Sequence, residues 1–438
     1  MAARTFTRRQ AALSLAVSTL ALSLAGCFGG SPATEQSTAP PVSSGAGEIP
    51  KKIGHPESPA DQANNKADIK TFEAGSNGIT VKLDVVPSEN VRTILQTQLR
   101  SGKGPDVFGY DTGPGFAGAL SKAGLVHDLT GAYEKYKWPV YDFAKQRVTF
   151  DGKLVGIPSQ MEEVGVFYNK DIFAKLGLAE PQNLADLMSA ATKIKDSGII
   201  PMTLADKEGW EGGHLLSMSL SSEVGSAGMD KLLAGDTPWD DPSVVAALKV
   251  WSDMYDQKLL TPSPTAVTYD NANALFYSGK AAMNPTGSWL AQEIERQAKF
   301  EVGFIPFPSS KDKGIFSGGL GSGTFISATS QKVDASEQFL NYSMSPEHGK
   351  WAVEKLQDIP AYPVDTTGIK ASPLFTQILN DTAKIADGTG DFGYNIDVLT
   401  NDAFNNAMWK GIQGLLSGQS DPEKVAGQLQ KSFKKPTS

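Results

Sequence analysis

Residues 151–171 read DGKLVGIPSQMEEVGVFYNKD and contain two short apolar segments with a polar segment between them. The first apolar segment, 153–157, is typical of a short strand. Pro158 ends it, because proline has no N–H to donate to a neighbouring strand. The second apolar segment, 165–168, is typical of another buried strand. The pattern therefore predicts two strands that flank the polar residues 159–163.

A polar segment between two buried strands has two interpretations. The chain can leave one sheet, pass a solvated cleft and enter a second sheet, or it can form a polar hairpin loop within one sheet. Spacing alone favours the hairpin. A helix follows in both cases: Asn169 opens it, Ile172 and Phe173 lie on its apolar face, and Gly177 ends it.

Four motifs recur along the chain in a recognisable order. The first is the stretch above, through Pro158, Glu162, Gly165 and the YNKD sequence of 168–171. The others are GPDVF at 104–108, FYSGKAAMNPTGSW at 276–289 and IPAYPV at 359–364. Together they resemble the solute-binding proteins of carbohydrate ABC importers, the extracellular sugar-binding family that includes maltose-binding protein. Each motif is weak by itself, but the resemblance covers nearly the whole chain after about residue 50.

The resemblance implies an α/β protein with the two-lobed type II fold of periplasmic binding proteins. One lobe is expected at residues 50–161 and 319–356, the other at 162–318 and 357–438, with a hinge of three crossings. The lobes are expected to close over an oligosaccharide, which the protein delivers to ABC permease subunits in the membrane, driven by an ATPase. On this interpretation the chain is a monomer, performs no reaction and needs no cofactor.

Composition excludes several other classes of function. The 438 residues suit two domains, and a chain that is 40% hydrophobic and 20% charged is globular in composition. The net charge of −8 argues against nucleic acid as a partner. The sequence has neither a G-x-S-x-G nor an H-E-x-x-H motif, and its four histidines have no metal-ligand spacing. The sequence therefore predicts no metal site and gives no motif of a serine hydrolase or a zinc protease.

The first 26 residues are typical of a lipoprotein signal peptide. Arg4, Arg8 and Arg9 form a basic start, and the apolar run 11–24 is too short to span a bilayer comfortably. The sequence Leu-Ala-Gly then precedes Cys27, the only cysteine. This segment resembles a bacterial lipobox, which implies cleavage before Cys27 and a lipid anchor on the outer face of the cell membrane. The alternative is an ordinary signal peptide that contains a cysteine, and the route of export, general or twin-arginine, stays open.

The next residues are less informative. Residues 27–49 are rich in Gly, Ser, Pro and Thr and are expected to be a flexible tether. Residues 48–70 contain three prolines, which disfavour a long strand, so the first strand of the fold and its site residues are in doubt.

A β-α-β unit follows. Apolar residues alternate from Ile79 to Val85, a helix is expected from Ser88, and 106–110 is a short buried strand. The two strands of such a unit are parallel. Because ligands of parallel sheets collect at the carboxyl ends of the strands, Tyr110 and Asp111 are predicted to lie at a cleft.

Predicted loops supply further groups that suit a sugar. A sugar ring has flat C–H faces that match aromatic planes. Its hydroxyl rim needs carboxylates and amides, because an unpaired buried hydroxyl costs about 1–3 kcal/mol. The main loops are 205–214, 284–289 after a short strand, and a Gly-rich return at 318–326. The predicted substrate-binding residues are Tyr110, Asp111, Gln160, Glu162, Glu163, Trp210, Glu211, His214, Asn284, Trp289, Gly319, Asp358, Tyr362, Tyr394 and Asp397.

Two other functions fit the same residues. A surface lipoprotein glycoside hydrolase would use two of the cleft carboxylates as an acid and base pair. A binding protein for another solute, such as a polyol, a peptide or a metal, would use the same fold. For Trp289, the motif favours stacking on the ligand, although an indole at that position can also cover a helix end.

Overall fold

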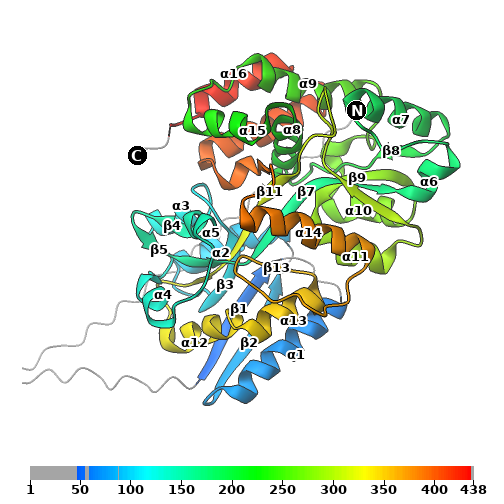
Figure 1. The fold of residues 1–438 in the computed structure, drawn as a ribbon. Helices are drawn as coiled ribbons and strands as arrows, with labels where there is room; N and C mark the ends of the chain where they lie inside the picture. The colour runs from blue at the N-terminus through cyan, green and yellow to red at the C-terminus, as the bar shows by residue number, and fades with distance from the viewer. Residues whose placement is uncertain (1–46, 55–58, 87, 436–438) are drawn as a thin grey trace, which may run out of the picture. The chain divides into compact units, whose positions relative to one another are not determined.

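The computed structural model describes residues 47–54, 59–86 and 88–435, and two sheets organise them (Figure 1). The predicted signal peptide, Cys27 and most of the 27–49 tether lie outside the described residues. We call the elements around the first sheet lobe 1 and those around the second sheet lobe 2.

The sheet of lobe 1 has five strands in the order β2-β1-β3-β12-β6. Their bounds are β1 (Gly47–Gly54), β2 (Ile79–Val86), β3 (Val107–Asp111), β6 (Gly156–Pro158) and β12 (Ser322–Ile326). The predicted strands β2 and β3 are parallel, but β1 lies between them and pairs with both. The prolines do not prevent this strand: β3 pairs only with Lys51 and Lys52, so Pro50 lies outside the stretch that is paired on both sides.

The sheet of lobe 2 is built around β7 (Gln160–Asn169), with the order β14-β11-β7-β9-β8 and with β10 and β13 also paired to β7. The other bounds are β8 (Ile200–Met202), β9 (Ala281–Gly287), β10 (Val302–Ile305), β11 (Ser317–Gly319), β13 (Ile359–Pro360) and β14 (Gly393–Tyr394). A separate hairpin joins β4 (Thr149–Phe150) and β5 (Lys153–Leu154).

The chain crosses from one sheet to the other here, as the first of the two interpretations expected, but the polar residues after Ser159 are part of a strand instead of a loop. From Gln160 onward they belong to β7, where β13 pairs with Gln160 and Met161 and β11 pairs with Glu162 and Glu163. Partner strands satisfy the backbone, so polar side chains can remain on a buried strand. The chain passes between the sheets at Ser159, between β11 and β12, and between α13 (Pro346–Leu356) and β13.

The helices of lobe 1 include several that the apolar pattern predicted. Their bounds are α1 (Pro59–Gly75), α2 (Ser88–Arg100), α3 (Ala117–Lys122), α4 (Thr130–Tyr136), α5 (Asp142–Lys145), α12 (Val333–Ser343) and α13. In α2, Val91, Leu95 and Leu99 are buried as expected, whereas Ile94 is 38% exposed. The sequence did not indicate α1, because 59–75 has little apolar periodicity.

The helices of lobe 2 are α6 (Lys170–Lys175), α7 (Leu184–Asp196), α8 (Trp210–Ala234), α9 (Pro242–Asp256), α10 (Tyr269–Tyr277), α11 (Ala291–Gln297), α14 (Pro373–Asp387), α15 (Asp402–Leu415) and α16 (Pro422–Ser432). The predicted caps Asn169, Asn183 and Asp241 each accept a hydrogen bond from a backbone N–H of the following turn. Among the described residues, no helix combines the length and apolar character needed to cross a membrane.

Two predicted loops are regular structure instead. Trp210 to His214 form the first turn of α8, because Gly209 takes a left-handed conformation with φ of 85° and lets the helix begin there. Asn284 lies within β9, where it pairs with Phe167 of β7. Both segments therefore hold their side chains more rigidly than loops would.

Candidate functional site

Arg92 of α2 and Asp111 of β3 form the centre of the site. Arg92 Nε donates to Asp111 Oδ2 at 2.9 Å. The guanidinium carbon of Arg92 also lies 4.8 Å from the ring centroid of Phe116 and 5.6 Å from that of Trp409. These contacts combine an ion pair with two cation–π interactions, so the arginine is held in one orientation.

The two lobes touch at this point. Phe116, just before α3 in lobe 1, stacks on Trp409 of α15 in lobe 2, with ring centroids 6.1 Å apart and planes at 30°. Gly113 has a φ of 86°, and a Cβ built on it would lie 1.9 Å from the carbonyl oxygen of Val398. Only glycine fits this close approach of the two backbones.

Two buried carboxyl groups lie close enough to Asp111 to affect each other's ionisation. Burial is the main cause that raises the pKa of Glu162 to about 7; the charges of Asp111 and Asp397 act in the same direction, and hydrogen bonds from Gln160 and Gly321 oppose the shift. Burial likewise raises the pKa of Asp397 to about 7, while the charge of Arg92 opposes the shift. Gln160 Nε2 donates to Glu162 Oε1 at 2.8 Å, so this glutamate is oriented before any ligand arrives. Both groups can accept hydrogen bonds from hydroxyls.

Aromatic rings form the second half of the site. Trp289 lies in the short 3₁₀ helix η3 (Ser288–Leu290), and its Nε1 donates to the Tyr269 hydroxyl at 2.8 Å. Trp210 lies 5.0 Å from Tyr269 and 5.1 Å from His214, centroid to centroid. His214 in turn lies 5.4 Å from Trp289. Trp210 and Trp289 are each partly exposed.

His214 is neutral in this environment. Burial lowers its pKa to about 3, and the charge of Arg92 contributes in the same direction. Its Nε2 lies 3.0 Å from Asn395 Nδ2, and the Asn395 Oδ1 accepts from Ser217 Oγ at 3.3 Å. This arrangement makes the amide the donor to Nε2 and puts the histidine proton on Nδ1.

Several buried polar atoms around these groups lack protein partners. Glu211 is 8% exposed, and burial, reinforced by Asp206 and Glu208, raises its pKa well above the usual range. Within the described part of the chain, no hydrogen-bond partner reaches Glu211 Oε2, Asp206 Oδ2, Glu208 Oε2, Asp397 Oδ1, Trp409 Nε1 or Arg147 Nε. Buried polar atoms are nearly always bonded in folded proteins, so this concentration indicates a place for a hydroxyl-rich ligand or water.

The structure brings most of the predicted residues into this region. Tyr110 receives a hydrogen bond from Gln96 Nε2 at 3.0 Å and lies beside Phe116. A Cβ on Gly319 would lie 3.5 Å from Glu162 Oε2. Tyr394 lies near Arg147, and burial together with its hydrogen bond to Asp230 raises its pKa to about 12.

Asn284 is linked to the aromatic rings indirectly, through Asn273 and Tyr269. Its Nδ2 donates to Asn273 Oδ1 at 2.9 Å, and Asn273 bonds the Tyr269 hydroxyl. The amide of Asn284 therefore positions Tyr269 through Asn273.

Three predicted residues lie elsewhere. Glu163 alternates with Glu162 along β7 and points to the opposite face, where Asp381 and Lys384 of α14 lie near it. Tyr362 is buried in the core of lobe 1 and donates its hydroxyl to Ser343 O at 2.9 Å. Asp358 lies at the third crossing, where its N–H donates to Ala352 O. Glu163 is kept from the site by the alternation of side chains along β7. Tyr362 and Asp358 are kept from it because their segments pack elsewhere.

Sequence reasoning missed Arg92, Phe116, Arg147, Trp409 and Asn395. Arg92 had a weak signal, because it lies one turn after Ser88, at the edge of the face of α2 that carries the buried Leu95 and Leu99. Trp409 had none, because α15 was not predicted and its indole reaches the site only through the packing of lobe 2. Across the described residues, no group of three or more His, Cys, Asp or Glu side chains has the geometry of a metal site.

Comparisons with known proteins agree with this architecture. The model of bacterial extracellular solute-binding proteins matches residues 56–350. A multiple sugar-binding protein from Streptococcus mutans is 31% identical over 371 residues, which cover 81% of this chain and 86% of that protein. Among solved structures, a chitin oligosaccharide binding protein matches with a TM-score of 0.77 and 24% identity, covering 89% of this chain and 98% of that one. A binding protein in complex with raffinose matches with a TM-score of 0.70 and 20% identity, covering 89% and 99%.

These matches span both sheets and the crossings between them. The family consists of substrate-binding receptors that act outside the cytoplasm. The two-lobed fold expected from the four motifs is therefore confirmed. The chain is a member of the bacterial extracellular solute-binding protein family.

Proposed function

We propose that this protein binds an oligosaccharide between its two lobes and delivers it to ABC permease subunits in the membrane. The observation that carries the proposal is the grouping of partly exposed indoles with buried acceptors that have no partner among the described residues. Trp210 and Trp289 both lie against His214, Glu211 follows Trp210 in α8, and a Cβ on Gly213 of the same helix would lie 3.5 Å from Asp397 Oδ2. Aromatic planes match the C–H faces of a sugar, and carboxylates match its hydroxyls.

The relatives support a sugar as the solute. The relative from Streptococcus mutans is named a multiple sugar-binding protein, and it aligns with four-fifths of this chain.

The remaining parts of the proposal concern location and assembly. The lobe boundaries at 50–161 with 319–356 and at 162–318 with 357–438 are consistent with the two sheets. We propose that the mature chain is a monomer held at the outer face of the membrane by lipid on Cys27. The tether of 27–49 then lets the lobes reach the permease.

A thermal-shift screen of the purified protein against a panel of neutral, amino and acidic oligosaccharides tests the proposal. At least one sugar should raise the melting temperature, and titration calorimetry should give a one-to-one complex. A panel that leaves the melting temperature unchanged, while a polyol or peptide raises it, would reject a sugar as the solute.

The same samples distinguish binding from hydrolysis. Glu162 and Asp397 are two buried carboxyl groups of the site, and a glycoside hydrolase uses a pair of carboxyl groups, one as acid and the other as base or nucleophile. We expect the bound oligosaccharide to be recovered intact after prolonged incubation. Shortened products that disappear in Glu162→Gln would show that the chain is an enzyme instead.

A further inference from the structure

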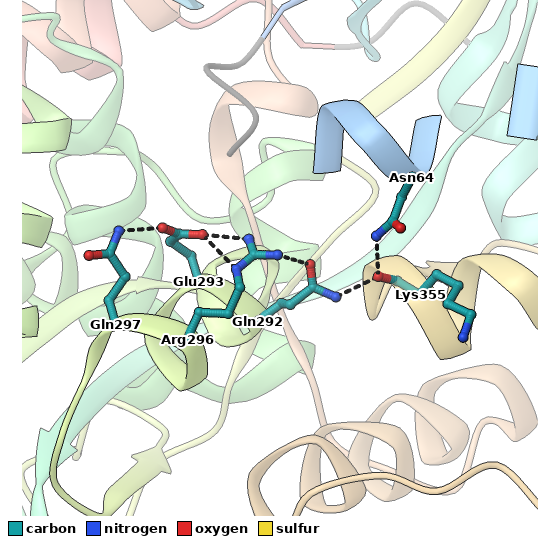
Figure 2. Close-up of polar contacts among 6 residues, drawn as sticks. All are labelled: Asn64, Gln292, Glu293, Arg296, Gln297 and Lys355. Atoms are coloured by element: carbon teal, nitrogen blue, oxygen red, sulfur yellow. Dashed lines mark hydrogen bonds and ion pairs between the residues drawn. The ribbon is translucent and has the colours of Figure 1, made fainter. Parts of the chain in front are cut away.

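A second set of contacts joins the lobes at the third crossing, apart from the aromatic site. Figure 2 shows its centre, the main-chain oxygen of Lys355 in the last turn of α13. Gln292 Nε2 of α11 donates to this oxygen at 2.7 Å, and Asn64 Nδ2 of α1 donates to it at 3.2 Å. The last carbonyls of a helix have no donor within the helix, so Lys355 O is available to accept both bonds.

The cap of α13 adds a second bond of the same kind. Gln357 takes a left-handed conformation with φ of 56°, and its Nε2 donates to Glu295 Oε2 of α11 at 2.9 Å. The other oxygen of Glu295 accepts from Ser372 Oγ, the N-cap of α14. We call the pair of interlobe bonds, from Gln292 to Lys355 O and from Gln357 to Glu295, the α11 latch.

The latch is oriented before the lobes meet. Arg296 Nη1 donates to Gln292 Oε1 at 2.8 Å, and Arg296 Nε donates to Glu293 Oε2 at 3.0 Å (Figure 2). These bonds lie within α11 and fix the amide of Gln292 so that its Nε2 faces α13. Less side-chain entropy is then lost when the interlobe bond forms.

The latch and the aromatic site share one rigid piece of lobe 2. Trp289 lies in η3, which runs directly into α11, so Gln292 follows the indole by less than one helical turn. Asn64 and Lys355 belong to lobe 1, and Gln357 caps α13 where the third crossing begins. Rotation of lobe 2 about the hinge therefore moves Trp289 relative to the site and Gln292 relative to Lys355 at the same time.

This conformation indicates which arrangement of the lobes, closed or open, the latch favours. The latch bonds occur together with the direct contacts between the lobes at the site, Phe116 on Trp409 and Gly113 against Val398. The latch therefore belongs to the arrangement in which the lobes touch. We propose that the α11 latch stabilises the closed arrangement of the lobes in the absence of ligand, and so strengthens ligand binding without touching the ligand.

The effect on affinity rests on the proposed function, but the effect on closure does not. Apparent affinity falls in proportion to the population of the binding-competent state. A hydrogen bond of this kind changes such an equilibrium by about two- to tenfold. The test is therefore made on the lobes themselves, in the absence of sugar.

Single-molecule energy transfer between two labels reports the separation of the lobes. Lys122→Cys, at the end of α3, and Lys410→Cys, beside Trp409, place one label on each lobe at exposed positions. The full-length chain carries Cys27→Ser, so only these two cysteines react. Gln292→Ala removes one latch bond. Gln357→Asn keeps an amide and tolerates the left-handed backbone, but is too short to reach Glu295.

Gln331→Ala is the matched control, because the side chain of this exposed glutamine donates to the nearby Thr329 O and takes no part in the latch. Without sugar, each latch variant should shift the ratio of closed to open molecules about two- to tenfold toward the longer separation, and the two changes together should shift it further. The control should match the parent, and melting curves check that every variant is folded.

The proposal is overturned if the folded latch variants give the parent distribution, or if they shift it toward shorter separations. A failed sugar screen would reject the proposed function and leave this result standing. If the protein binds a sugar and the latch stabilises closure, calorimetry with the best sugar of the panel should show that the latch variants lose affinity. The loss should equal the fold change in the closed population.

Discussion

At the scale of single residues, Trp289 shows how one side chain serves both packing and a binding role. Its indole nitrogen donates to Tyr269 at 2.8 Å, and its side chain packs against two hydrophobic clusters while remaining partly exposed. The hydrogen bond holds the plane in one orientation, so little entropy is lost if a sugar stacks on it.

We expect Trp289→Ala to weaken sugar binding by about ten- to several-hundredfold. A stacked ring buries roughly 100–150 Å², worth about 2.5–4 kcal/mol, of which about 1.5–3.5 kcal/mol survives the ordering costs. Trp289→Phe should lose less affinity, because it keeps an aromatic plane. It should still lose some, because it lacks the hydrogen bond to Tyr269. Titration calorimetry measures the change and melting curves verify folding. Binding by the alanine variant within about twofold of the parent would assign Trp289 to packing alone.

At the scale of elements, β7 separates two acidic neighbours into different environments. Glu162 faces the site, whereas Glu163 is fully buried on the other face, and neither of its carboxyl oxygens has a partner among the described residues. Burial raises the pKa of Glu163 to about 9. The group is therefore protonated at neutral pH and carries no charge into the core.

This raised pKa has a consequence for stability. In the unfolded chain a glutamate titrates near pH 4.3, so between about pH 4.5 and 9 the folded state binds more protons than the unfolded state. The contribution of Glu163 to stability is fully present below about pH 4.5 and is lost as the pH rises toward 9. Glu163→Gln removes this titration and keeps the shape.

We therefore expect Glu163→Gln and the parent to melt alike near pH 5 and to separate as the pH rises. By pH 9 the variant should melt about 2–4 °C higher. Calorimetric melting across this range measures the difference. A constant difference at every pH would mean that Glu163 titrates normally, and Glu180→Gln, at an exposed salt bridge to Lys313, is a suitable control.

At the scale of the whole molecule, the two lobes meet across the site and again at the latch. The three crossings are short, and each is paired with a strand of one sheet or the other. Short paired crossings suit a hinge, in which a few backbone torsions change while each sheet stays rigid.

We expect saturating sugar to decrease the radius of gyration measured by small-angle scattering, because the ligand binds both lobes and favours their closed arrangement. The comparison uses the same sample before and after addition of the best sugar of the panel. Scattering curves that superimpose with and without sugar would indicate a rigid, preformed site.

We also expect Cys27→Ala to release the protein from the membrane fraction into the medium. The prediction follows from the sequence Leu-Ala-Gly-Cys and the tether after it. Mass spectrometry of the native protein should find diacylated Cys27 as the first residue. An unmodified, uncleaved Cys27 in the native protein would contradict the prediction.

Much of the architecture was determined by local sequence. Alternation from Ile79 to Val86, the caps Asn183 and Asp241 and the stops at glycine all act through neighbours in the chain, so they are legible without the fold. The order of the four motifs identified the family for the same reason. Residues such as Asp111 and Trp289 could be predicted as site residues because they follow predicted strands.

Tertiary structure alone decided how the site is completed. Trp409 reaches Arg92 only because α15 packs on α8 and turns one indole toward the other lobe. Glu163 lies away from Glu162 because pairing with β11, β13 and β9 extends β7 through residues that look like a loop. These outcomes depend on contacts between segments more than a hundred residues apart, and no local pattern of charge or hydrophobicity encodes which of those segments will meet.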